Sequence, residues 1–327
     1  MSEPRWSFLQ TFPIPDDGLD MIRAAGTLVQ RLMPDSETLM AAISGADAIL
    51  AGSEPITDAV MANAPRLKVI GRFGVGVDSV DIAAATRRGI PVLNTPAVNA
   101  QTVAEHAITL MAGLARRMGF SDKAIRESTF KLRGSIMGTE LHGKTLGVVG
   151  LGQIGKRVAR AGVLGFGMRL LVTTAHPDPK RLEDLGVDGE FVGIDDLLRR
   201  SDVVTLHCLV NAATQGLLSA ERIGLMKRGA YLVNTSRGAL VDEQALIAAL
   251  REGRLGGAGL DVFAVEPPDP SNPLLKMDNT LLSPHVSSNS VEAFSRMGVM
   301  ICSAVLDYLR GGHPPNCVNP EVYARRG

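Results

Sequence analysis

The chain has 327 residues, of which 45% are hydrophobic and 21% are charged, an ordinary composition for a soluble globular protein. Its 34 Lys and Arg residues balance its 34 Asp and Glu residues, so no global electrostatic field attracts nucleic acid or an anionic membrane surface. The length exceeds one typical core and predicts two domains of roughly 100 to 200 residues each.

The cysteines and the N-terminus bear on the compartment. Cys208, Cys302 and Cys317 are odd in number and lack C-x-x-C spacing, which argues against a disulfide framework or a zinc site. The first residues lack a basic start followed by an apolar stretch, and no segment approaches ~18 uninterrupted apolar residues. We therefore expect a cytoplasmic protein with no metal, no membrane partner and no nucleic-acid partner.

From about residue 20 to residue 98, helical stretches alternate with short β-rich runs. Helices are expected over 36–44, 56–65 and 81–89, and strands over 47–52, 67–74 and 90–96. This alternation predicts βαβ units and a parallel sheet.

A long helix linking two domains is then expected over Thr102 to Met118, where apolar residues recur at helical spacing. Residues 119–142 are polar, basic and weakly periodic, and we interpret them as an arm or loop. A second series of strands and helices follows as far as residue 283, which is typical of a doubly wound α/β domain. The final helix, Ser290 to Leu309, is expected to return to the first domain.

The second series opens with a glycine-rich turn, Gly150-Leu-Gly152-Gln-Ile-Gly155. A β-type run over 145–149 precedes the turn and an amphipathic stretch over 156–164 follows it, which is the context of a dinucleotide-binding fingerprint. Gly150 allows a tight turn, Gly152 lets the backbone approach a pyrophosphate, and Gly155 permits close packing of helix on strand. The helix N-terminus offers its N–H groups to the phosphates.

An acidic residue is expected about 20 positions later to bind the ribose 2′-hydroxyl, but that position falls on Thr174. One hypothesis is relaxed or NADP-leaning specificity, with His176, Lys180 and Arg181 partly neutralising a 2′-phosphate. In the alternative, Asp178 or the Thr174 hydroxyl still serves NAD. The sequence does not choose between them.

Three polar residues follow strand-like runs further along. The runs are Tyr231–Asn234, Gly259–Phe263 and Thr280–Ser283, and the polar residues are Arg237, Glu266 and His285. Open α/β sheets build their sites at strand ends, although each residue alone could be a satisfied polar group there. Arginine matches a carboxylate with two hydrogen bonds, histidine exchanges a proton near neutral pH, and glutamate can hold that histidine in its charged form. Together they suit oxidation or reduction of a 2-oxygenated carboxylic acid.

These motifs resemble those of the D-isomer-specific 2-hydroxyacid dehydrogenases, which include 3-phosphoglycerate, glyoxylate/hydroxypyruvate and formate dehydrogenases. The similarity runs in order through VIGRFGVGVDSVDIAAATRRGIPVLNTPAVNAQTVAEHA, GKTLGVVGLGQIG, NTSRGALVDEQAL, GLDVFAVEPP and LLSPHVSSNS. It implies a Rossmann coenzyme domain, residues 103–289, inserted into a flavodoxin-like substrate domain, residues 1–102 plus 290–327. It also implies a cleft between them and a homodimer made mainly by coenzyme domains, with 119–142 as a candidate arm.

The resemblance implies a role for each matching residue. Arg237 would bind the substrate carboxylate, His285 would be the general acid/base, and Glu266 its partner. Asp261 would hold the nicotinamide carboxamide, and the N–H groups of Val75 and Gly76 would help bind the carboxylate. The residues expected to contact NAD or NADP are Thr102, Gly150, Gly152, Gln153, Ile154, Gly155, Thr174, His207, Leu209, Thr214, Thr235, Ser236, Arg237, Asp261 and His285.

Departures from the family pattern bear on the substrate. Family members usually have proline at Leu209 and glycines at Ser287 and Ser288, so fine positioning of the coenzyme is in doubt. Phosphoglycerate-specific members carry an arginine where this chain has Gly52, with Glu54 close by, and a further one that aligns near Arg133. The chain is also too short for the regulatory domain that many of those enzymes have.

We therefore expect a small 2-oxo or 2-hydroxy acid of the glyoxylate or hydroxypyruvate type. D-3-phosphoglycerate dehydrogenase is the alternative within the family. A coenzyme-sensing corepressor is the alternative outside enzymes. Of the other histidines, His106 is expected to be structural, and His142 and His313 are expected at the surface.

Overall fold

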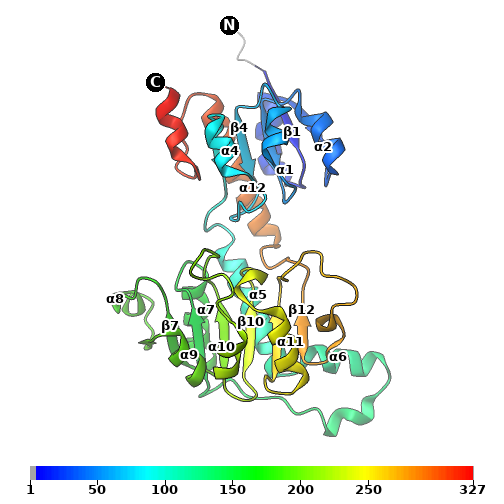
Figure 1. The fold of residues 1–327 in the computed structure, drawn as a ribbon, viewed down its shortest axis with the longest axis vertical. Helices are drawn as coiled ribbons and strands as arrows, with labels where there is room; N and C mark the ends of the chain where they lie inside the picture. The colour runs from blue at the N-terminus through cyan, green and yellow to red at the C-terminus, as the bar shows by residue number, and fades with distance from the viewer. Residues whose placement is uncertain (1–4, 327) are drawn as a thin grey trace. The chain divides into compact units, whose positions relative to one another are not determined.

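The computed structural model describes residues 5–326 and divides the chain into two compact units (Figure 1). Unit 1 comprises residues 1–99 and 289–327, and unit 2 comprises residues 100–288. These boundaries fall within a few residues of the predicted ones, while the substrate and coenzyme roles of the units stay predictions. Residues 1–4 and 327, which belong to the predicted substrate domain, lie outside the described residues.

The sheet of unit 1 is entirely parallel, with the strand order β2-β1-β3-β4-β5. This is the flavodoxin-like order, as predicted. Its strands are β1 (Trp6–Gln10), β2 (Gly26–Gln30), β3 (Ala48–Ala51), β4 (Val69–Arg72) and β5 (Val92–Leu93).

Helices cover both faces of this sheet because its strands are apolar on both sides. Phe8 and Leu50 pack with Ile301 on one face, and Leu9 packs with Leu39 on the other, following the alternation of side chains along a strand. The first face carries α1 (Asp16–Ala25) and α12 (Val291–Leu309), the second carries α2 (Ser36–Ile43), α3 (Asp58–Ala62) and α4 (Ile82–Arg87), and a 3₁₀ helix, η4 (Pro320–Arg326), follows α12. The final helix thus completes the core of the N-terminal segment.

The sheet of unit 2 is also parallel, with the order β12-β11-β10-β9-β6-β7-β8. The strands are β6 (Thr145–Val149), β7 (Arg169–Thr173), β8 (Glu190–Phe191), β9 (Val203–Leu206), β10 (Tyr231–Asn234), β11 (Gly257–Leu260) and β12 (Thr280–Leu282). Strand order reverses between β6 and β9, so this is the doubly wound Rossmann arrangement, in which ligands bind outside the carboxyl ends of the strands at the reversal.

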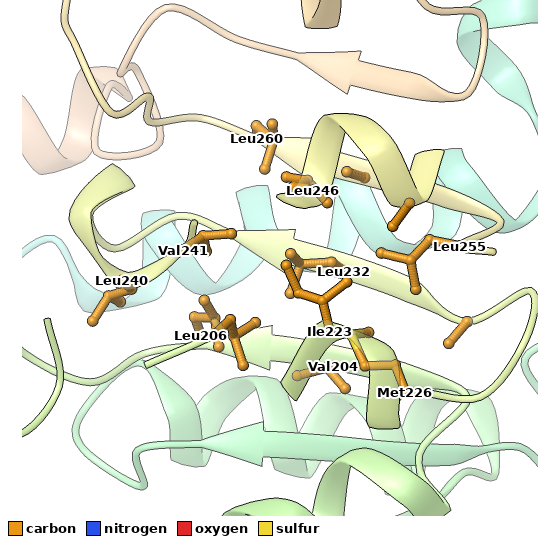
Figure 2. Packing of buried hydrophobic residues seen from close by; sticks show 14 of the residues in the cluster. Val204, Leu206, Ile223, Met226, Leu232, Leu240, Val241, Leu246, Leu255 and Leu260 are labelled. Carbon is orange, nitrogen blue, oxygen red and sulfur yellow. The ribbon is translucent and has the colours of Figure 1, made fainter. Parts of the chain in front are cut away.

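Two helical layers enclose the sheet of unit 2. One layer holds α5 (Ala100–Ala115), α7 (Gly155–Phe166) and the short α8 (Lys180–Glu183), the other holds α9 (Ile194–Arg200), α10 (Ala220–Leu225) and α11 (Glu243–Arg251), and two 3₁₀ helices are η2 (Gly238–Leu240) and η3 (Pro273–Lys276). Figure 2 shows the second layer, where Leu206 and Leu232 of the sheet pack with Ile223 of α10. These buried layers make the sheet a rigid support for residues at its carboxyl edge.

The region predicted to be an arm or a loop contains helical segments, and its role as an arm stays a prediction. The long helix ends at Ala115, Arg117 takes a left-handed φ of 52°, and residues 119–142 contain α6 (Met118–Arg126) and η1 (Phe130–Gly134). Two exposed ion pairs involve α6: Arg126 with Asp122 at 2.7 Å, one helical turn away, and Lys123 with Asp278 at 2.8 Å. In Figure 1, α6 lies at the edge of unit 2 near β12.

The strand predicted over 259–263 is also misplaced, because β11 spans 257–260. Its glycines let α5 pack closely on the sheet: a Cβ on Gly259 would lie 2.9 Å from the Cβ of Leu110. Because glycine has a low strand propensity, the sequence pattern placed the predicted strand two to three residues too late in the chain.

Within residues 5–326, no helix combines the length and apolarity needed to cross a bilayer. Across the same residues, no group of three or more His, Cys, Asp or Glu side chains is arranged to hold a metal ion.

Candidate active site

Arg237 is presented by a side-chain-stabilised turn at the end of β10. The buried amide of Asn234 donates to the carbonyl oxygen of Arg237 at 2.8 Å, and its Oδ1 accepts from the N–H of Ser236 at 3.0 Å. Such turns at asparagine substitute side-chain for backbone hydrogen bonds. Asn234 therefore fixes the backbone from which the half-buried Arg237 projects.

Gly238 brings the Arg237 turn against the segment that holds Glu266. A Cβ on Gly238 would lie 1.9 Å from the carbonyl oxygen of Phe263, a separation that no side chain can have. Only glycine fits at this approach, which keeps the two segments in contact.

Glu266 and His285 form a close pair. Glu266 Oε2 lies 2.7 Å from His285 Nδ1, and Oε1 accepts from the N–H of Phe263 at 3.1 Å. Partial burial opposes ionisation of Glu266, but the hydrogen bonds with His285 and Phe263 and the charge of Arg237 lower its pKa overall. The carboxylate is thus ionised at neutral pH and fixes Nδ1 of His285, which leaves Nε2 for a substrate.

His285 belongs to a turn, residues 283–288, that we call the His285 loop. His285 has a left-handed φ of 53°, a conformation that non-glycine residues rarely adopt. Its N–H donates to the carbonyl oxygen of Asp261 at 2.8 Å. The carboxylate of Asp261 accepts from Ser283 Oγ at 2.6 Å and from the N–H groups of Val286 and Ser287 at 2.8 and 2.9 Å.

The Asp261 side chain is therefore fully buried beneath the loop. Its contact with the carboxamide of a coenzyme stays a prediction, whereas its contacts with the loop are present in the fold. The structure thus brings Arg237, Glu266, His285 and Asp261 together at the carboxyl edge of the sheet in unit 2.

The glycine-rich turn connects β6 to α7 at the point where the strand order reverses. Gly150 has a φ of 95°, and a Cβ there would lie 2.7 Å from the carbonyl carbon of His207. Among the described residues, apart from the two chain neighbours of Gly152, no atom lies within 4 Å of its Cβ position. No side chain caps the N-terminus of α7 at Ile154. Open space beside uncapped N–H groups suits a pyrophosphate.

Two predicted coenzyme contacts carry polar atoms without partners. His207 Nδ1 and Thr235 Oγ1 are buried and make no hydrogen bond within the part of the chain that the structure describes, although buried polar atoms are nearly always paired. Burial lowers the pKa of His207 to about 3, so the imidazole is neutral. These atoms and the turn at Gly150 fit a bound dinucleotide.

Other residues predicted to contact the coenzyme include Leu209, Thr214, Ser236 and Thr102. Thr214 Oγ1 donates to the carbonyl oxygen of Leu209 at 2.6 Å. The Leu209 side chain itself is exposed. Ser236 Oγ donates to the carbonyl oxygen of Cys208 at 2.7 Å. Thr102 lies in the first turn of α5.

The loop after β7 bears on the choice of coenzyme. Thr174 is half-buried directly after the strand. The Asp178 carboxylate accepts from the N–H of Lys180 at 3.0 Å, so it stabilises the local turn. The guanidinium of Arg181 donates to the carbonyl oxygen of Leu151, in the glycine-rich turn, and to that of His176 at 3.1 Å. A cation, not a carboxylate, is thus attached to the glycine-rich turn.

The residues predicted to choose the substrate lie in unit 1, except Arg133, which is exposed on η1 with its guanidinium 5.4 Å from the Phe130 ring centroid. Among residues 5–326, the N–H groups of Val75 and Gly76 donate no hydrogen bond to the protein. Glu54 Oε1 accepts from Thr11 Oγ1 and from the N–H of Gly52, the latter at 3.1 Å. A fixed carboxylate therefore lies against Gly52.

Sequence reasoning missed the residues that support the site. Asn234, Gly238 and Ser283 lie within the matched motifs, but their roles depend on contacts made in the folded chain. His106, expected to be structural, lies with Nε2 2.8 Å from Ser283 Oγ. His142 and His313 are exposed, as expected.

Comparison with known proteins identifies the family. Residues 108–287 match the model of the D-isomer specific 2-hydroxyacid dehydrogenase NAD binding domain. The chain belongs to the D-isomer specific 2-hydroxyacid dehydrogenases. It is therefore an oxidoreductase that uses a nicotinamide coenzyme, NAD or NADP, and its two parallel-sheet α/β domains are those of the family.

Relatives with different named activities are similarly close. A glyoxylate reductase from Korarchaeum cryptofilum is 41% identical over 95% of each chain. A D-3-phosphoglycerate dehydrogenase from Mycobacterium tuberculosis is 42% identical over 88% of this dehydrogenase but only 53% of its own length. The crystal structure of the TT0316 protein from Thermus thermophilus superimposes with a TM-score of 0.89 and 37% identity, covering 95% of this chain and 99% of that one. Identity alone does not select the substrate.

Proposed function

We propose that this dehydrogenase interconverts small unphosphorylated 2-oxo acids and D-2-hydroxy acids of the glyoxylate or hydroxypyruvate type. The Glu266–His285 pair, 2.7 Å apart and beside Arg237, carries the proposal for the chemistry. The glyoxylate reductase that matches nearly the whole chain supports the substrate class.

Arg237, His285 and Glu266 have different roles in the proposed reaction. The coenzyme, when bound, supplies or accepts the hydride at the substrate carbon. Arg237 binds the substrate carboxylate through its planar fork. His285, held through Nδ1 by Glu266, donates a proton from Nε2 to the oxygen that becomes a hydroxyl, and removes it in the oxidative direction. Glu266 balances the positive charge that His285 carries before it donates.

Replacing the acid/base tests this mechanism directly. His285→Ala removes the proton donor, so kcat should fall by about 10²- to 10⁴-fold while the coenzyme Kd stays within about threefold of its wild-type value. Arg237→Lys should raise the KM for the 2-oxo acid, because a point charge replaces a bidentate fork. An unchanged kcat in His285→Ala would refute the mechanism.

Glu54 supports the choice of an unphosphorylated substrate. Its carboxylate is held by Thr11 and Gly52, and the Phe12 side chain occupies the space beside Gly52, since a Cβ there would lie 2.7 Å from its ring. A fixed negative charge disfavours a phosphate dianion. The wild type should therefore prefer hydroxypyruvate to phosphohydroxypyruvate in kcat/KM, and Glu54→Gln should narrow the ratio. A wild-type preference for the phosphorylated acid would favour the phosphoglycerate alternative.

We infer that the coenzyme site accepts NADPH as well as NADH. No carboxylate occupies position 174, Asp178 is engaged locally, and Arg181 lies against the glycine-rich turn. Comparing kcat/KM for the two coenzymes tests this inference, and Thr174→Asp should shift the ratio towards NADH because a carboxylate repels a 2′-phosphate. A strong NADH preference in the wild type would contradict it.

We further propose that the protein is a cytoplasmic homodimer in which α6 and η1 contact the partner subunit. Large apolar side chains are exposed on and beside these helices: Met118, Ile125, Phe130, Leu132 and Met137. Contiguous exposed apolar groups of this kind mark interaction surfaces.

A further inference from the structure

A hydrogen-bonded chain runs from α5 to the His285 loop. His106 Nε2, on α5, lies 2.8 Å from Ser283 Oγ, and Ser283 Oγ donates to Asp261 Oδ1 at 2.6 Å. Asp261 in turn accepts from the N–H groups of Val286 and Ser287. The Asp261 side chain is inaccessible to solvent, and the His106 side chain is 24% exposed.

The proton positions along this chain follow from its chemistry. An ionised carboxylate only accepts hydrogen bonds, so the single hydroxyl proton of Ser283 is committed to Asp261. Ser283 Oγ must then accept from His106, and His106 must carry a proton on Nε2. The imidazole thus acts as a fixed donor that aligns the Ser283 hydroxyl with Asp261.

We propose that His106 and Ser283 are positioning residues for the reaction, acting through Asp261 on the backbone of His285. The loop needs such anchoring because His285 has a left-handed φ of 53°, which costs about 1 to 2 kcal/mol for a non-glycine residue. Two charge-assisted N–H bonds to Asp261 hold the turn on the C-terminal side of His285, and the carbonyl oxygen of Asp261 holds His285 itself. Neither His106 nor Ser283 needs to touch the substrate.

Hydrogen exchange of the free enzyme tests the anchoring without substrate or coenzyme. In Ser283→Ala and in His106→Phe, peptides covering 283–290 should exchange about tenfold faster than in the wild type, because loss of one bond in the chain weakens the others. Ser283→Thr keeps the hydroxyl and should restore wild-type exchange. Thr109→Ala is the control on α5, since its hydroxyl bonds only to the carbonyl oxygen of Glu105.

Kinetics then separate positioning from general stability. We expect kcat to fall about tenfold in Ser283→Ala and His106→Phe with the coenzyme Kd within about threefold of wild type, as a displaced catalytic group predicts.

Unchanged exchange of the loop in both variants would overturn the proposal, as would Ser283→Thr behaving like Ser283→Ala or faster exchange throughout unit 2. The inference for catalysis rests on the proposed role of His285. If His285→Ala keeps its activity while Ser283→Ala loosens the loop, the proposed mechanism fails and the anchoring stands.

Discussion

His207 shows how burial sets the charge of a single residue near the predicted coenzyme contacts. Desolvation lowers its pKa to about 3. Within residues 5–326, its Nδ1 has no hydrogen-bond partner, and its Nε2 lies 2.9 Å from Thr205 Oγ1. A neutral imidazole is therefore part of the folded state at neutral pH.

The lowered pKa of His207 makes the free energy of unfolding depend on pH. The folded pKa of His207 lies below the unfolded value of about 6.5, so its contribution is complete above pH 6.5 and is lost as the pH falls towards 3. One proton bound only by the unfolded chain reduces stability by up to about 1.4 kcal/mol per pH unit. Between pH 6.5 and 5, the wild type should lose about 1.6 kcal/mol more than His207→Asn in urea unfolding. Parallel stability curves for the wild type and His207→Asn would show that the unfolded and folded pKa values of His207 are alike.

At the scale of elements, close backbone approaches hold the site together. Gly238 packs on the carbonyl group of Phe263, so an added methyl group must separate the Arg237 turn from the Glu266 segment. Gly238→Ala should destabilise unit 2 by about 1 to 3 kcal/mol and reduce kcat/KM at least tenfold. Gly224→Ala, in α10 with no atom within 4 Å of its Cβ position, should be neutral or slightly stabilising. Equal stability of both variants in urea unfolding would contradict this packing argument.

For Gly152 we expect the opposite effect on stability from that at Gly238, because the protein leaves the Cβ position of Gly152 open. Gly152→Ala should therefore change the free energy of unfolding by no more than about 0.5 kcal/mol. If the open space receives a pyrophosphate, the same methyl group should weaken coenzyme binding at least tenfold. Fluorescence titration with NADH and NADPH measures this, and Gly193→Ala, also open, is the control. Wild-type affinity in Gly152→Ala would place the phosphates elsewhere.

The elements that sequence patterns predict well are those whose signal is local. Neighbouring residues are enough to predict three elements: the strand before Gly150, the strand that ends at Asn234, and the terminal helix that Ser290 caps. They are not enough for the strand β11, because its glycines are explained by distant parts of the chain: Gly259 lies against Leu110 of α5, and Gly257 lies against the carbonyl oxygen of Asn279. The partnership of His106 with Ser283 spans 177 positions, and no local pattern could reveal it.

At the scale of the whole molecule, both parallel sheets and their helical layers follow from alternating strands and helices, whereas self-association depends on surface features. The arm predicted from its polar composition instead contains α6 and η1, and it exposes Ile125 and Phe130 by 54% and 61%. A partner subunit that covered these side chains would recover about 25 cal/mol for each Å² of apolar surface removed from water. A solitary subunit leaves this surface in water.

Charge introduced on this surface should therefore separate the proposed dimer. Ile125→Glu combined with Phe130→Glu would place two carboxylates in a contact whose core should be depleted of charge, and light scattering should show a shift from dimer towards monomer at micromolar concentration. Coenzyme affinity should persist in the monomer, since Gly150, Gly152 and Gly155 lie in one continuous turn of one chain. Leu32→Glu, at a residue 48% exposed in unit 1, should leave the mass unchanged. A monomeric wild-type protein would contradict the proposed dimer. A double variant that stays dimeric would show that α6 and η1 lie outside the interface, because a dimer could not bury two carboxylates without partners.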